Sequence, residues 1–205
     1  MSATCLGDAA VEVAAELSEL ADLLEALDDD TWELPSLCEG WRVRDVVAHV
    51  TMPTRWSGPR LALPMLRHRF RWNDLADHLA RRDAQALTTA ELLAALRSRR
   101  LREWRPPGGG AQGALVHAVV HGIDVTAPLG IDRELPAGRM RLVLAGLTSP
   151  RSLSHFGVDL DGIELYADDV SWSHGSGRAV HLDARQAALV LSGRRRVEDS
   201  SDAAG

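Results

Sequence analysis

Residues 111–125 read AQGALVHAVVHGIDV, and this stretch decides the fold. A helix with this sequence is apolar almost all round, so little of its surface could face water. Neighbouring helices must therefore cover it on several sides. At helical spacing Gly113, His117, His121 and Asp124 share one face, which predicts a single stripe of different chemistry on a buried central helix.

A second helix is predicted over residues 8–27, where apolar side chains recur at alternating spacings of four and three: Val13, Leu17, Leu20, Leu24 and Leu27. Thr88 and Glu91 form a capping box that marks another helix start, with an end expected near Glu103. The pattern also favours helices over residues 43–50, 65–82 and 137–147. The chain is therefore predicted to be mainly α, a four-helix bundle with a few minor helices.

The pattern changes after Gly162. Residues 163–167 alternate apolar and polar, as expected of a strand, and a glycine-rich turn over 173–178 precedes a second short strand at 179–182. Residues 184–191 favour a helix that ends at Gly193. We expect a helical bundle over 1–150, a small α/β appendage over 151–193 and a disordered polar tail over 194–205.

Composition limits the function. The 205 residues carry a formal net charge of −6, which argues against nucleic-acid and anionic-membrane partners. The arginine clusters at 67–71 and 97–105 are interpreted as solvated helix faces. Cys5 and Cys38 show no pairing pattern, and no basic segment followed by an apolar stretch opens the chain. These features favour a cytoplasmic protein.

His117 and His121 lie one helical turn apart, and His49 offers a third imidazole from another apolar helix. Each histidine alone could equally be a core residue with a hydrogen-bonded ring. Together they meet the requirement of an open divalent metal site, with zinc favoured and nickel or other ions left open. The remaining histidines are expected at the surface: His68, His78, His155, His174 and His181.

Two further residues have alternative roles. Asp124 either accepts a hydrogen bond from a ligand imidazole or simply ends its helix before Pro128. Cys38 is either a reactive thiol or a packed side chain, and packing is favoured.

Residues 34–50 (LPSLCEGWRVRDVVAHV) resemble the N-terminal metal-binding domain of mycothiol-dependent maleylpyruvate isomerases, which belongs to the DinB-like superfamily of metal-binding four-helix bundles. Residues 116–125 (VHAVVHGIDV) with 128–130 (PLG) are similar to a second motif of that family. Residues 162–175 (GIELYADDVSWSHG) and 191–194 (LSGR) are similar to its C-terminal segment. The resemblance covers most of the chain in the family's order.

The resemblance implies mycothiol as a thiol cosubstrate and a small electrophile as its partner. The isomerase branch tends to carry a glutamate where this chain has His117, which favours thiol S-transfer over isomerisation. The C-terminal segment resembles a shortened accessory domain, so no substrate-binding arginine is assigned. A non-catalytic, stress-associated metal-binding module is the alternative function, and both monomer and homodimer stay open.

Overall fold

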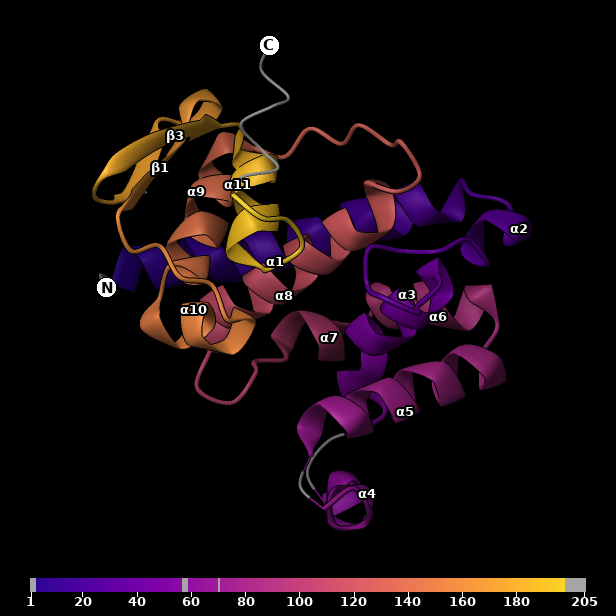
Figure 1. Ribbon diagram of the computed structural model, residues 1–205. Helices are drawn as coiled ribbons and strands as arrows, with labels where there is room; N and C mark the ends of the chain where they lie inside the picture. Colours follow the sequence, from indigo (N-terminus) through magenta and orange to yellow (C-terminus); the bar gives the residue numbers. More distant parts are fainter. Residues whose placement is uncertain (1–2, 57–58, 70, 198–205) are drawn as a thin grey trace.

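A computed structural model describes residues 3–56, 59–69 and 71–197 of the protein (Figure 1). The N-terminal helices are α1 (Ala3–Glu25), α2 (Asp29–Trp32), α3 (Val43–Thr51), the short 3₁₀ turn η1 (Met52–Thr54), α4 (Pro59–Arg67) and α5 (Trp72–Ala86). They are followed by α6 (Thr89–Leu96), α7 (Arg99–Glu103), α8 (Gly110–Thr126), α9 (Ala137–Leu147) and α10 (Pro150–Phe156). The C-terminal segment holds β1 (Ile163–Ala167), η2 (Asp168–Val170), β2 (Trp172–Gly175), β3 (Arg178–Leu182) and α11 (Ala184–Leu191).

Helix α8 is the central helix, as its sequence predicts. It contacts α1, α3, α9 and α11, and α6 in turn contacts both α1 and α3. Figure 1 shows α1 and α8 running side by side through the molecule. Leu115 and Val119 of α8 are completely buried, as is Leu24 of α1. Covering α8 on so many sides leaves only one stripe of it available for polar chemistry.

An ionic cluster ties α9 to α1: Glu12, Glu16, Glu19, Arg133 and Arg139. The Arg139 side chain is 2% exposed and donates to Glu12, Glu16 and Glu19 at 2.6 to 2.9 Å. Arg133 donates to both Glu16 oxygens, at 2.6 and 3.0 Å. Glu16 is fully buried and needs both arginines, because a buried carboxylate without cationic partners is strongly unfavourable.

The C-terminal sheet has the order β2-β1-β3, with β1 antiparallel to β2 and parallel to β3. Leu165 and Ala167 of β1 are buried, and so are Val180 and Leu182 of β3. This apolar face belongs to the main core, and the segment contacts α9 through η2 and α11. The structure therefore confirms a mainly α fold with a small α/β appendage.

Some predicted boundaries were wrong. The helix predicted over 65–82 is two helices, α4 and α5, separated near Arg69, which adopts a left-handed φ of 52°. The helix expected to run to Glu103 is broken where Ser98 caps α7 by accepting from the Leu101 N–H. Strand β2 occupies part of the predicted turn at 173–178. A side-chain cap decides the break at Ser98, and a left-handed residue marks the break near Arg69; apolar periodicity reveals neither.

The first residue of the predicted disordered tail is Arg194, and it makes ordered contacts. Arg194 lies against Asp124 and is half-buried, because that carboxylate requires a cation. Residues 198–205 of the predicted tail lie outside the described residues. None of the helices in the described part of the chain has the length and apolar character needed to cross a lipid bilayer.

Candidate metal centre

Three imidazoles converge beside α8. The Nε2 atoms of His49 on α3 and His117 on α8 lie 3.2 Å apart. With His121 they form a group whose potential ligand atoms all lie within 4.8 Å of one another. Ligands at about 2.0–2.1 Å from a tetrahedral ion stand roughly 3.3 Å apart. The spacing of His49 and His117 therefore fits two positions of such a site, and His121 stands near enough to supply the third.

Burial keeps two of these rings neutral. Burial first, and then the charge that His121 can carry, lower the pKa of His49 to about 3. Burial followed by the other two histidines also holds the pKa of His117 well below its ordinary value. A metal binds the neutral imidazole, so these two rings do not have to lose a proton first.

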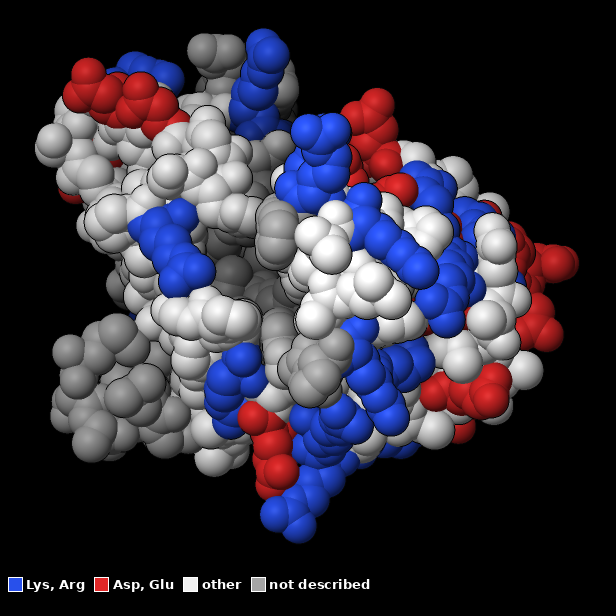
Figure 2. Space-filling view, turned by 90° about the horizontal axis from the view of Figure 1, so that it is seen from below, with Lys and Arg blue, Asp and Glu red and all other residues white. Residues whose placement is uncertain are grey.

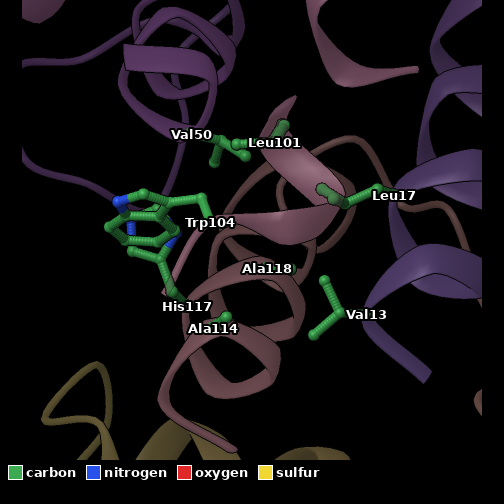
Figure 3. Close-up of a pocket in the computed structure, with 8 residues that line it drawn as sticks. All are labelled: Val13, Leu17, Val50, Leu101, Trp104, Ala114, His117 and Ala118. Carbon is green, nitrogen blue, oxygen red and sulfur yellow. The ribbon is translucent and has the colours of Figure 1, made fainter. Parts of the chain in front are cut away.

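Apolar side chains form one wall of the site. A cavity of about 10 Å³ lies beside His117 and is lined by Val13, Leu17, Val50, Leu101, Trp104, Ala114 and Ala118 (Figure 3). A space of this size admits at most one water molecule. The ring of Trp104 packs against His117 with centroids 5.3 Å apart, and Trp41 packs against His49 at 5.1 Å. Two tryptophans thus shield the imidazoles from bulk water.

Asp124 holds together three parts of the chain. Its carboxylate lies 2.9 Å from Nδ1 of His121 and receives two hydrogen bonds from Arg194, at 3.0 and 2.9 Å. It also accepts from the Cys38 thiol at 3.2 Å. Burial alone would raise the pKa of Asp124, but the hydrogen bonds from His121 and Arg194 outweigh it and hold that pKa far below its usual range. The carboxylate is therefore ionised.

The carboxylate determines which nitrogen of His121 is free. An ionised carboxylate only accepts hydrogen bonds, so Nδ1 of His121 is the nitrogen that carries the proton. Nε2 then keeps its lone pair for a ligand, in the arrangement common to carboxylate, histidine and metal. This hydrogen bond is the contact that the predicted orienting role of Asp124 requires.

Cys38 is packed, as expected, against the edge of the core. Its loop, residues 34–42, is fixed to α8 by the bond from the Leu37 N–H to the Asp124 carbonyl at 2.9 Å. Burial raises the pKa of the Cys38 thiol to about 12, with a further contribution from the Asp124 carboxylate. The thiol therefore stays protonated at neutral pH and serves as a hydrogen-bond donor.

The contacts of Arg194, Trp41 and Trp104 with this centre were not predicted from the sequence. Their distances along the chain from the histidines give no sign of them. One signal was present: an aspartate inside an apolar helix needs a cationic partner, and the LSGR block supplied one. Four of the other histidines are exposed, as predicted, and His68 is partly buried.

A family model described as the mycothiol maleylpyruvate isomerase N-terminal domain matches residues 13–126. The chain belongs to this family. All three converging histidines, together with Cys38 and Asp124, fall inside the matched range, whereas Arg194 lies beyond it. A comparison with curated protein sequences finds no match.

Two solved structures share the fold. A crystal structure of the mycothiol-dependent maleylpyruvate isomerase is similar with a TM-score of 0.61 and 17% identity, covering 93% of this chain and 90% of that one. A histidine-to-alanine mutant of that isomerase is similar with a TM-score of 0.54 and 18% identity, covering 95% and 91%. The likeness therefore extends beyond the N-terminal domain of the mycothiol maleylpyruvate isomerase family into the C-terminal segment.

Replacing Asp124 by asparagine is expected to weaken metal binding roughly 10- to 100-fold, because losing the carboxylate that orients a ligand imidazole has that effect. Competition with a chromophoric chelator measures the affinity. Asp168→Asn is the matched control, because Asp168 also pairs with a histidine, His181, at 3.0 Å, but both of these side chains are exposed. Equal affinity in the wild type and in Asp124→Asn would exclude this orienting role.

Proposed function

We propose that this chain is a metal-dependent enzyme that activates mycothiol for attack on a small electrophile. The main support is the convergence of His49, His117 and His121 beside one apolar wall. Membership of the mycothiol maleylpyruvate isomerase family supports the choice of thiol. Three nitrogen ligands favour zinc, and nickel or another divalent ion would also suit them.

The protein's residues have separate tasks in this proposal. His49, His117 and His121 hold the ion, and Asp124 keeps the His121 ring in the correct tautomer. Arg194 balances the Asp124 charge. A divalent ion on three neutral ligands keeps its positive charge and lowers the pKa of an incoming thiol, which then reacts as a thiolate near neutral pH. Trp41 and Trp104 limit the access of water to the histidines.

Two reactions of such a thiolate fit the family. The sulfur can add to an activated double bond, which allows rotation, and then leave again with its electron pair to give the isomer. Alternatively, the sulfur forms a bond to an electrophilic carbon while the leaving group departs with the electron pair of the broken bond. We favour this S-transfer, because His117 stands where the isomerase branch is expected to have a glutamate.

Adding mycothiol to the cobalt-loaded protein is expected to produce a sulfur-to-cobalt charge-transfer band that saturates at one equivalent. The reason is that three protein ligands leave a position open for the thiol sulfur. Absorption spectroscopy follows the titration. Mycothiol consumption with a panel of small electrophiles should accompany the band.

The S-methylated form of mycothiol is the control, since it has no thiol proton to lose and should give no such band. A band without mycothiol consumption on any electrophile would favour the non-catalytic metal-binding module. The absence of both at saturating thiol would reject the enzymatic proposal.

A further inference from the structure

Helix α4 has apolar side chains on two opposite faces. Leu61 and Met65 pack on the small second core formed by Met52, Leu75 and Leu79. Leu63 and Leu66 point away from that core and are 54% and 62% exposed. Trp72, at the start of α5, is also 44% exposed. A nine-residue helix already anchored on one side thus presents a second apolar face to solvent.

Arginines surround this outward face. Residues 59–72 contain four arginines and no acidic residue, in a chain whose net charge is −6. At about 100° per residue, Arg60 and Arg67 lie roughly 40–60° around the helix from Leu63. The side chains of Arg60, Arg67 and Arg69 are exposed, and within the described residues these side chains make no hydrogen bond or ion pair. We call Leu63, Leu66 and Trp72 with these three arginines the α4 patch.

The face seen from below in Figure 1 is shown in Figure 2, where blue arginines border a white, uncharged area near the middle of the view. Carboxylates appear mainly toward the margins of this face. Such a surface combines apolar side chains for insertion with cations for a negatively charged partner.

A second copy of the chain is a poor occupant. A symmetric dimer would bring two sets of unpaired arginines together, and like charges in an interface are unfavourable. A stable dimer also buries roughly 800 Å² on each partner, far more than three apolar side chains provide. Leucine and tryptophan flanked by arginine are instead the residues that hold amphipathic helices in the headgroup region of anionic bilayers.

We propose that the α4 patch docks the protein reversibly on anionic phospholipid surfaces. Leu63, Leu66 and Trp72 enter the boundary between headgroups and acyl chains, while Arg60, Arg67 and Arg69 contact the phosphates. The expectation of no membrane partner came from the charge of the whole chain. That average conceals three arginine side chains that have no acidic partner within the described residues. Electrostatic attraction acts over only about one Debye length, which is about 8 Å at physiological salt.

The test uses the full chain and sedimentation with vesicles of phosphatidylglycerol and phosphatidylcholine in equal parts, compared with pure phosphatidylcholine. Leu63→Ser with Leu66→Ser removes the apolar contribution, and a triple variant with Arg60→Gln, Arg67→Gln and Arg69→Gln removes the charge. Each is expected to lower vesicle affinity at least about tenfold. Wild-type affinity should fall as salt is raised, and neutral vesicles should bind weakly.

Val11→Ser and Arg178→Gln are matched controls, because both side chains are exposed elsewhere on the surface. Both should bind like the wild type. Equal binding to neutral and anionic vesicles, or unchanged binding by either patch variant, would overturn the proposal. So would a wild-type dimer in analytical ultracentrifugation that the Leu63→Ser, Leu66→Ser variant converts to monomer, since the patch would then be an interface between copies.

Discussion

His121→Ala is expected to reduce bound metal from one equivalent to almost none after dialysis. The change removes one of three imidazoles and also leaves Asp124 without the ring that it orients at 2.9 Å. Losing an orienting carboxylate alone costs about 10- to 100-fold in affinity, so loss of a ligand should cost more than about 100-fold. Elemental analysis of dialysed protein measures the metal content.

His174→Ala is the control, because His174 is exposed on β2, outside the cluster. It should keep the full equivalent. Circular dichroism of both proteins without metal should match the wild type. A dialysed His121→Ala protein that still held one equivalent would place the metal elsewhere in the molecule.

Arg139→Ala is expected to lower the free energy of unfolding by about 3–5 kcal/mol, because it removes one partner of a buried ionic cluster. Glu16, fully buried, would keep only Arg133, and the link between α1 and α9 would weaken. Urea unfolding of the metal-free protein measures the change. Without metal, the measured change reports the stability of the fold alone and contains no contribution from metal binding.

Arg97→Ala is the matched control, since Arg97 also pairs with acids on α1, Asp22 and Glu25, but at the surface. Its effect should be much smaller. An Arg139→Ala protein within about 1 kcal/mol of the wild type would show that the ionic cluster contributes little to the fold.

The cluster also predicts the direction of acid destabilisation. The hydrogen bond from Arg139, with further attraction from Arg133, holds the pKa of Glu19 below its usual value. The unfolded chain therefore binds more protons, so this contribution is complete above the ordinary pKa of glutamate and is lost as pH falls through the lowered one. Arg139→Ala should accordingly show a weaker dependence of stability on pH in that acidic range.

Sequence periodicity predicted the elements that bury a continuous apolar face. The ranges of α9, β1 and α11 agree with the structure, and α8 differs by one residue at each end. Periodicity did not predict helix ends at which a single residue changes the direction of the backbone. The left-handed Arg69 separates α4 from α5, and the Ser98 cap separates α6 from α7. These breaks depend on a local side-chain cap and on the backbone conformation of one residue, which a helical repeat does not record.

The candidate site also has one part that the sequence predicts and one part that it does not. His117 and His121 share a helical face at fixed spacing, so their proximity follows from the sequence alone. The position of His49 beside them requires α3 to pack against α8. The sequence offered His49 as a third imidazole from another apolar helix, and the family resemblance supported that choice. Trp104 reaches the site through tertiary packing, and nothing in its local sequence indicates it. For Arg194 the one signal was the need of the buried Asp124 for a cation, which does not say which arginine supplies it.

The carboxylate of Asp124 couples the proposed metal site thermodynamically to the C-terminal segment of the chain. One oxygen, Oδ2, faces both His121 and Arg194, the residue that follows α11 and its glycine. If the contact between Arg194 and Asp124 increases the affinity for the ion, then bound metal must stabilise that contact by the same free energy. Metal titrations should then be sensitive to truncations distant from every ligand, and protease resistance near Arg194 should report metal occupancy.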